Sequence, residues 1–392
     1  MKLWIRNANF TISLSLTLLR CLGFWSPDGL AGNKRLLYNC YSFVSFMFLL
    51  GIYILIQVVD MIKIWGDLPL MTGTAFLLFT NFAHATKVIN IVIRKNRIQR
   101  VIQQANAVLM GVQSEEARRI VKSCNVETSI QLCLYFLLTF VTTVGWATSA
   151  EKHQLPLRAW YPYDTSKSPA YELTYVHQVA ALLIAAYINV AKDSLVSSLI
   201  AQCRCRLRLV GLALASLGQD LKIDYQSQLS PAQENILNLR LKACVLEHQT
   251  VLAAVTELQA CFSKPTFAQF TVSLIIICVT AFQLVSQTGN LVRLLSMGTY
   301  LMNMIFQVFI YCYQGNKLSV ESSEIAGSAY ISPWYLGSVK FRRALLIVMV
   351  RSRRVAKITA GGFTTLSLAS FMAIIKASYS LFTLLQQVEQ KK

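Results

Sequence analysis

The sequence predicts an all-α polytopic membrane protein with seven transmembrane helices, on two observations. The 392-residue chain is 55% hydrophobic and only 14% charged, with a mean hydropathy of +0.48, whereas about 25% charged residues are usual in a soluble domain. It also contains seven apolar runs, each long enough for the roughly 20 residues that a membrane-spanning helix requires. These runs occupy residues 38–62, 70–93, 128–149, 171–198, 266–288, 293–314 and 363–385.

The segment before the first span, residues 1–37, lacks the pattern of a cleaved signal peptide. Its apolar run from Phe10 to Leu19 is followed by Arg20, Cys21 and Trp25 without a small-residue cleavage site. We therefore expect this segment to lie along the cytosolic membrane surface, with its Phe, Leu and Trp side chains inserted.

The net charge of +19 indicates membrane topology rather than nucleic-acid binding, because the Lys and Arg residues are scattered among the connections between spans. The N-terminal segment and the second, fourth and sixth connections hold 27 of them, and the other connections and the tail hold 7. The positive-inside rule then places the N-terminus in the cytosol and the C-terminus outside the cell. This orientation is opposite to that of a G-protein-coupled receptor.

The ten cysteines agree with this orientation, because none lies in a connection assigned to the outside. A reducing compartment keeps such thiols free, and the chain lacks the cysteines for the disulfide usual outside the third span of a G-protein-coupled receptor. The pair Cys203 and Cys205 has no two further ligands at the spacing of a metal site. We expect neither a metal nor a cofactor.

The motifs of common enzyme classes are missing from the sequence. It has no HExxH, Gly-rich phosphate loop or GxSxG, and Asp60 and Asp193 are isolated acidic residues rather than a carboxylate pair on an apolar face. The few charges within the spans do not suggest an ion relay, and no half-chain repeat indicates a transporter. The sequence therefore favours a receptor or channel over an enzyme.

The connections assigned to the cytosol carry helix signals. The fourth span continues from Ala201 to Leu217, and the run Ser230-Pro231-Ala232-Gln233 offers an N-cap serine, a first-position proline and a third-position glutamine. Pro265 predicts a kink where the following helix reaches the membrane. We therefore expect long helices in these connections.

The predicted organisation follows from these boundaries. It comprises an interfacial segment at 1–37, transmembrane helices one to four at 38–198, helical extensions at 199–265, helices five and six at 266–314, a polar connection with a helix at 315–362, and a seventh helix with a short external tail at 363–392.

We expect the outer halves of spans two to four and six to hold a small ligand, because aromatic and hydroxyl side chains recur there at helical spacing. The candidates are Phe76, Phe79, Thr80 and Ala83 on the second span, Thr139, Thr142, Thr143 and Trp146 on the third, and Tyr175, Gln178 and Leu182 on the fourth. Aromatic walls with a few hydroxyls are typical of a site for a small, mostly apolar molecule. Ordinary packing, with Tyr and Trp at the membrane interface, stays open as the alternative for each single residue.

The last span carries a polar stripe near its end. Ser380, Thr383 and Gln387 are spaced i, i+3 and i+7 and so share one helix face. Lipid tails offer no hydrogen-bond partners to such groups, so the stripe indicates contact with water or a polar partner. The alternative is that the hydroxyls bond their own helix backbone. The candidate pore residues are Ser380, Thr383, Leu384, Gln386 and Gln387.

The C-terminal quarter resembles the signature of the insect odorant receptors, a family of seven-span ligand-gated cation channels. The matching residues are Tyr313 and Gly315, the Ser322 to Tyr330 segment with Ala326, Trp334, the run Thr359-Ala360-Gly361-Gly362-Phe363, and Lys376-Ala377-Ser378-Tyr379-Ser380-Leu381-Phe382-Thr383-Leu384-Leu385. The resemblance implies an odorant-gated, non-selective cation channel subunit. It would bind a small volatile, mostly apolar odorant in a transmembrane pocket among spans two to four.

The resemblance also implies an anchor, partners and a location. It implies that the extensions at 199–265 pack with the helix around Val339 to Val350 into a cytosolic anchor domain where subunits meet. It implies a heterotetramer with co-receptor subunits, surrounded by membrane lipids and without nucleic acid, in the plasma membrane of olfactory sensory neuron dendrites. The connection at 199–265 lacks the insertion that marks the co-receptor, which favours a ligand-tuning subunit. The alternatives are a gustatory-receptor-type channel, which Ser378-Tyr379 and Gln386-Gln387 match only in part, and, with less support, a G-protein-coupled receptor.

Epitope tags test the predicted orientation. Because 27 of the 34 connection charges lie on the side assigned to the cytosol, a tag before Met1 should be hidden from antibody on intact cells and a tag after Lys392 should be accessible. Permeabilised cells provide the control, in which both tags should stain. The reverse pattern on intact cells would contradict the channel topology.

Overall fold

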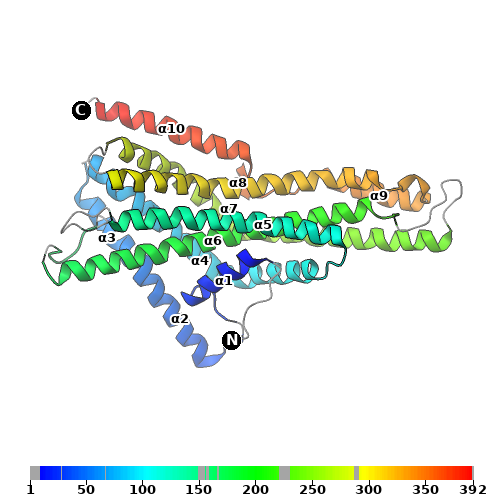
Figure 1. Ribbon diagram of the computed structural model, residues 1–392, viewed down its shortest axis with the longest axis horizontal. Coiled ribbons are helices and arrows are strands. Elements are labelled where there is room, and N and C mark those ends of the chain that lie inside the picture. Colours follow the sequence, from blue (N-terminus) through cyan, green and yellow to red (C-terminus); the bar gives the residue numbers. More distant parts are fainter. Residues whose placement is uncertain are drawn as a thin grey trace.

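The computed structural model describes residues 9–27, 29–66, 68–148, 155, 159–165, 167–219, 230–286 and 291–390. Seven helices of this part of the chain are long and apolar enough to cross a membrane, which confirms the predicted fold class. The long helices lie side by side along one axis, and the C-terminal helix lies at the edge of the bundle (Figure 1).

The helices follow one another with few interruptions. The bounds are α1 Phe10–Cys21, α2 Gly32–Phe46, a π-helical segment Met47–Gly51, α3 Ile52–Lys63, α4 Leu68–Met110, α5 Glu115–Thr148, α6 Ala170–Ala215, α7 Pro231–Ser286, α8 Leu291–Ile331, a short 3-10 helix Trp334–Leu336, α9 Val339–Ser352 and α10 Leu368–Gln390. Two short strands, β1 Thr359–Ala360 and β2 Thr364–Thr365, pair antiparallel between α9 and α10. The segment from α2 to α3 forms the first candidate span.

Several helices are much longer than a bilayer requires. The 56 residues of α7 extend about 84 Å at 1.5 Å per residue, against a hydrocarbon core of about 30 Å. The predicted start of α7 is confirmed, because Ser230 Oγ accepts a hydrogen bond from the Gln233 amide at 3.3 Å and Gln233 Oε1 accepts one from the Ser230 amide at 2.9 Å. The predicted extension of the fourth span is also present, since α6 continues to Ala215.

Two boundaries in the C-terminal quarter differ from the prediction. The polar connection expected after residue 314 is helical, because α8 continues to Ile331 and its hydroxyls bond carbonyls of the preceding turn, as Ser319 Oγ does to Gly315 O at 3.1 Å. The last helix begins at Leu368 rather than Phe363. Gly361 and Gly362 have φ of 64° and 84°, a left-handed backbone that a helix cannot include and that glycine adopts readily.

The expectation that the N-terminal segment inserts its apolar side chains into the membrane surface is wrong for several of them. Ile12, Leu16 and Leu19 of α1 are buried in the main core of the protein, as is Trp25 after it. This apolar face packs against α5 and α6. Of the apolar residues in α1, Phe10 remains exposed.

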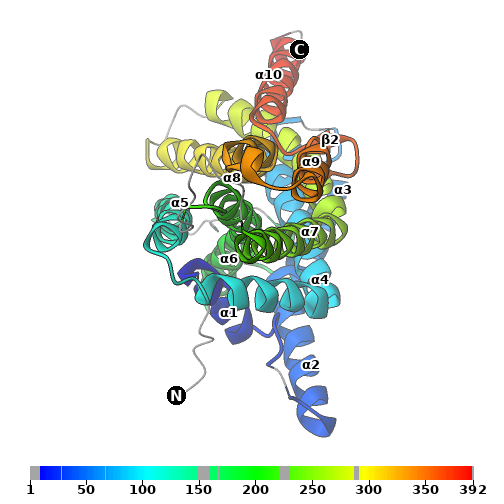
Figure 2. The same ribbon diagram turned by 90° about the vertical axis from the view of Figure 1, so that its right-hand side faces the viewer.

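The centre of the bundle is α6. Every residue from Ile188 to Leu207 is buried, as expected for a helix that has neighbours on all sides. It contacts α1, α4, α5, α7 and α8, and the end view shows these helices around it (Figure 2). Towards the end of the molecule that carries α9, a second core joins Leu214, Leu241, Ile325 and Phe341 from α6 to α9.

Gly315 on α8 lies where the chain just before α10 approaches α8 closely, and a substitution there tests whether this close approach stabilises the fold. A Cβ added at Gly315 would overlap the Leu366 side chain and lie 2.6 Å from Leu366 O. Gly315→Ala should therefore lower the thermal unfolding temperature of the detergent-solubilised protein, by a shift corresponding to about 1–3 kcal/mol of overpacking. The matched control is Gly327→Ala on the same helix, where a Cβ meets open space. It should leave the temperature unchanged or raise it, since alanine favours a helix by about 1 kcal/mol over glycine. Equal effects of the two substitutions would contradict this role of Gly315.

Candidate functional site

A cavity of about 80 Å³ lies between the first, second, third, fourth and sixth spans. Its volume is several times the roughly 10–15 Å³ that holds one water molecule. The residues that line it are Leu49, Tyr53, Leu77, Thr80, Asn81, His84, Thr139, Thr142, Thr143, Trp146, Ala181, Leu182, Ala185, Ala186, Asn189, Tyr300, Asn303 and Met304. They combine an aromatic and aliphatic wall with a few polar groups, the composition of a site for a small organic molecule.

The structure brings together part of the predicted ligand-binding set. Thr80, Thr139, Thr142, Thr143, Trp146 and Leu182 line this cavity. Their place in the cavity is set by the helix faces that α4, α5 and α6 turn towards one another. Whether a ligand contacts them stays a prediction.

The other members of the predicted set lie elsewhere. Phe79 and Ala83 pack in a hydrophobic cluster beside the cavity, because Thr80 and His84 take the α4 face that points into it and the residue before each turns away by about 100°. Tyr175 OH donates to Ala147 O at 2.7 Å, and Gln178 Nε2 donates to Tyr161 OH at 2.9 Å. The side chain of Phe76 lies outside the described residues.

The cavity also uses residues that the sequence analysis did not name, although it expected the sixth span to contribute. Tyr300, Asn303 and Met304 come from α8, and Tyr53 comes from the first span. The α8 group had a signal in the sequence, since residues 300, 303, 304 and 307 are spaced as one helix face. For Tyr53 we find no signal, because an apolar span next to lipid and one next to a cavity have the same composition.

Most hydroxyls in the cavity wall bond within the protein. Thr80 Oγ1 and Tyr300 OH are 2.6 Å apart, and Asn303 Nδ2 donates to Thr139 Oγ1 at 3.2 Å. Three buried atoms in the wall, Asn303 Oδ1, His84 Nδ1 and Tyr53 OH, have no hydrogen-bond partner in the described part of the chain. A buried polar atom without a partner is costly, so these atoms are the ones that gain most from a bound polar group.

Below the cavity, Asp193 is the centre of a buried polar network, which corrects the view of it as an isolated acidic residue. Its carboxylate accepts hydrogen bonds from Lys87 Nζ at 2.7 Å, Tyr135 OH at 3.0 Å, Tyr311 OH at 2.8 Å and Gln307 Nε2. These donors come from α4, α5 and α8, and Asp193 itself comes from α6. The second isolated carboxylate, Asp60, accepts from Thr74 Oγ1 at 2.8 Å.

The network reaches both the cavity and the fifth span. Asn189, one turn before Asp193, lines the cavity and donates from Nδ2 to Tyr135 OH at 3.2 Å. Gln269 of α7 donates to Gln307 at 2.8 Å. A second buried lysine, Lys192, donates to His84 O at 3.1 Å, so the α4 segment beside the cavity is held by two ammonium groups.

The candidate pore residues lie on α10, which projects from the bundle in the end view (Figure 2). Leu384 and Gln387 are exposed, while Thr383 and Gln386 are half-buried. The hydroxyls of Ser380 and Thr383 donate to the carbonyls of Lys376 at 3.1 Å and Ser380 at 2.9 Å, the local bonding that was the alternative explanation for the stripe. The glutamine amides are therefore the stronger indication of a polar surrounding.

Among the described residues, no three His, Cys, Asp or Glu side chains are grouped in a way that could hold a metal ion.

Comparison with known proteins gives consistent matches along most of the chain. A family model described as 7tm odorant receptor matches residues 67–379. Odorant receptor Or1 of Anopheles gambiae is 26% identical over 96% of this chain and 95% of its own length. Odorant receptor 63a of Drosophila melanogaster is 31% identical over 60% of this chain and 55% of its own length.

Solved structures share the fold at low sequence identity. The structure of the insect olfactory receptor OR5 from Machilis hrabei in complex with eugenol has a TM-score of 0.82 and 16% identity, with 96% of this chain and 97% of that chain covered. The structure of the same receptor described without eugenol has a TM-score of 0.81 and 17% identity, with the same coverage.

A double-mutant cycle tests the pair of Lys87 and Asp193. Removing one charge leaves the other buried and unpaired, so Lys87→Met and Asp193→Leu should each lower the stability of the solubilised protein by about 3–5 kcal/mol. The double substitution should cost clearly less than the sum of the two, because it leaves neither charge of the pair buried without the other. Thermal unfolding followed by fluorescence size-exclusion chromatography measures all four proteins. Additive losses would show that the two charges do not depend on each other.

Proposed function

Because the chain belongs to the odorant receptor family, whose members are receptors and not enzymes, we propose that it is an odorant-gated, non-selective cation channel subunit. The observation that carries the proposal is the cavity between the first, second, third, fourth and sixth spans. It is walled mainly by apolar side chains, as a pocket for a volatile molecule must be, and it adjoins the Asp193 network that joins the helices around it.

The proposed ligand is a small, mostly apolar odorant that carries a hydrogen-bond donor. Trp146, Leu182 and Met304 supply apolar wall, and Asn303 Oδ1 is a buried acceptor without a partner in the described chain. A hydroxyl on the ligand would satisfy that acceptor. A ligand with more polar groups than the wall has unpartnered atoms would bury some of those groups without hydrogen bonds, which is costly.

The proposed coupling from cavity to pore runs through α8. Tyr300 and Asn303 of α8 face the cavity, and Phe309 lies further along the same helix. The Phe309 ring contacts the Phe371 ring of α10 edge to face, with 5.6 Å between centroids. A ligand that favours one position of α8 would in this way bias the position of α10, as a change of population between two states requires.

In the proposed channel, α10 lines the pore through the surface that contains Ser380, Thr383, Leu384, Gln386 and Gln387. The exposure of Leu384 and Gln387 supports this arrangement, because a pore-lining face stays uncovered in a single subunit. We further propose that the chain is the ligand-tuning subunit of a heterotetramer with co-receptor subunits. It would act in the dendrite membrane of olfactory sensory neurons, with its N-terminus in the cytosol.

A cavity-filling substitution tests the pocket. Cells that express the receptor with and without a co-receptor are recorded against an odorant panel, and odorant-evoked cation current is expected only with both. Ala185→Leu places a larger side chain in the cavity wall and should raise the half-activating concentration about tenfold or more, since overpacking costs about 1–3 kcal/mol.

The matched control for this test is Ala180→Leu, the same change at an α6 position that does not line the cavity. It should leave the response unchanged, and surface labelling should be equal for both variants. A normal response from Ala185→Leu would remove this cavity as the odorant site. The absence of odorant-evoked current from any combination would overturn the proposed function as a whole.

Cysteine accessibility tests the pore assignment. Thr383→Cys and Gln387→Cys should make the current sensitive to a water-soluble thiol reagent, because a pore face contacts water. Phe382→Cys should stay insensitive, since the Phe382 ring packs beside Tyr379 with 6.2 Å between centroids. Equal modification of all three positions would indicate a frayed helix end rather than a pore wall.

A further inference from the structure

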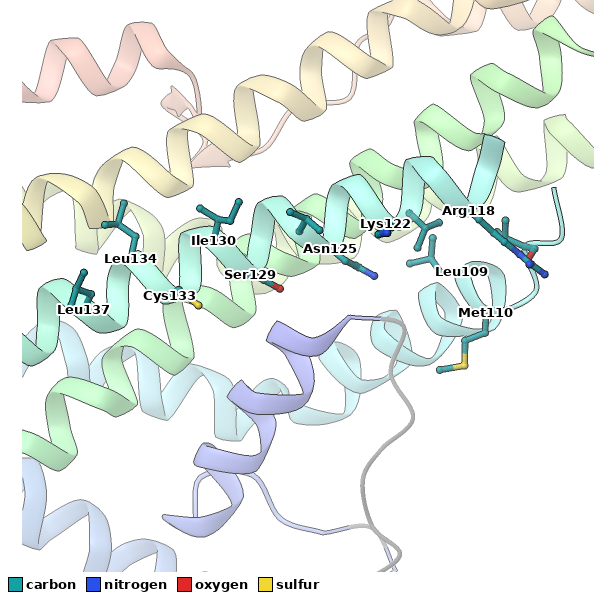
Figure 3. Close-up of a pocket in the computed structure, with 13 residues that line it drawn as sticks. Leu109, Met110, Arg118, Lys122, Asn125, Ser129, Ile130, Cys133, Leu134 and Leu137 are labelled. Carbon is teal, nitrogen blue, oxygen red and sulfur yellow. The ribbon is translucent and has the colours of Figure 1, made fainter. Parts of the chain in front are cut away.

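A second and larger hollow lies on the outside of the bundle, along α5. This groove has a volume of about 890 Å³. It is lined by Leu109, Met110, Val112, Arg118, Val121, Lys122, Asn125, Val126, Ser129, Ile130, Cys133, Leu134 and Leu137. Figure 3 shows these side chains following α5, with Leu109 and Met110 of α4 near its Arg118 end. No residue of the odorant cavity belongs to it.

The groove changes in chemistry along its length. Its first part contains the cations Arg118 and Lys122, its middle contains Asn125 and Ser129, and its remainder is apolar. The same order, from phosphate through glycerol esters to acyl chain, is found along a phospholipid. The apolar part from residue 126 to residue 137 extends about 16 Å at 1.5 Å per residue, about half of the roughly 30 Å hydrocarbon core.

The cations of the groove have no carboxylate partner within the described residues. Arg118 donates from Nε to Val112 O at 3.4 Å, and neither Arg118 nor Lys122 forms an ion pair there. The adjacent Arg119, which does not line the groove, pairs with Glu115 at 3.8 Å. Two cations at one end of an apolar groove therefore keep their charge available for an anionic group.

The apolar wall is open along its length. Val126 is 48% exposed, Ile130 62% and Leu137 58%. A small anion from water would make no favourable contact with these side chains, whereas an acyl chain would bury their apolar surface.

We propose that this groove binds one anionic phospholipid, with its phosphate at Arg118 and Lys122 and an acyl chain along Val126 to Leu137. The proposal rests on the orientation of the proposed channel, which places Arg118 on the cytosolic side. Anionic lipids are concentrated in that leaflet. The lipid would join the end of α4 to α5 from the outside, at a position separate from the odorant cavity.

Native mass spectrometry of the purified full-length receptor with added phosphatidylserine or phosphatidylcholine tests the proposal. The unmodified receptor should retain phosphatidylserine preferentially. Arg118→Gln/Lys122→Gln should lower that retention about tenfold or more, as the loss of two cations beside an anionic headgroup predicts, without lowering the retention of phosphatidylcholine. The matched control is Arg100→Gln/Arg119→Gln, which removes two exposed cations that do not line the groove and should retain phosphatidylserine normally.

Further arms separate the lipid from other occupants. Ile130→Ser/Leu137→Ser should weaken retention of phosphatidylserine through the acyl chain, and glycerophosphoserine, the headgroup without chains, should not displace it. Displacement by glycerophosphoserine would show an anion site rather than a lipid site and would overturn the proposal. An equal loss of phosphatidylserine retention in Arg100→Gln/Arg119→Gln would overturn the proposal as well. So would phosphatidylserine retention that appears only after deletion of residues 1–8, because that result would assign the groove to this segment. Because no readout depends on odorant-evoked current, failure here is distinguishable from failure of the proposed channel function.

Discussion

The buried ion pair between Lys87 and Asp193, 2.7 Å apart, is the interaction on which the arrangement of the bundle depends. Two charges inside a membrane bundle are stable only when they are paired and their remaining hydrogen-bonding capacity is used. Asp193 meets this condition through Tyr135, Gln307 and Tyr311. The donors belong to three different helices, so the hydrogen bonds that satisfy this one carboxylate hold α4, α5 and α8 in place around α6. Apolar side chains alone would allow these helices to slide past one another, because lipid competes well for such contacts.

The shape of the cavity between the spans is a consequence of this arrangement. Asn189 belongs to the polar network on one side and to the cavity wall on the other, so the packing below the cavity and the shape of the cavity are not independent. The same applies to α8, which brings Tyr300 to the cavity, Gln307 to Asp193 and Phe309 to α10. One rigid helix therefore contacts the proposed ligand site, the network and the proposed pore helix. A small shift of α8 would therefore change the contacts at all three places.

The outer surface of the bundle differs from its interior in what it leaves uncovered. The α10 face with Leu384 and Gln387 is exposed, as a subunit contact or pore surface is in a single chain. The α5 groove instead combines exposed apolar residues with two cations that have no carboxylate partner within the described residues, which matches the proposed lipid better than a protein partner. Long helices such as α7 extend well beyond the bilayer thickness, and their outer ends form the core that joins α6 to α9.

The sequence by itself determined the class of the protein and the number of its spans, because both depend on local composition that the bilayer imposes on every span. It also determined the capping box at Ser230, whose hydrogen bonds lie within four residues. It predicted that Trp146 and Thr80 lie near a site but did not distinguish them from Phe79, since neighbouring residues differ only in the direction in which the folded helix turns them. Only the tertiary structure decided that Asp193 is paired rather than isolated, and that α8 and Tyr53 complete the cavity. The partners of Asp193 are separated from it by 58 to 118 residues in the chain, and no local pattern specifies which helices will surround a buried charge.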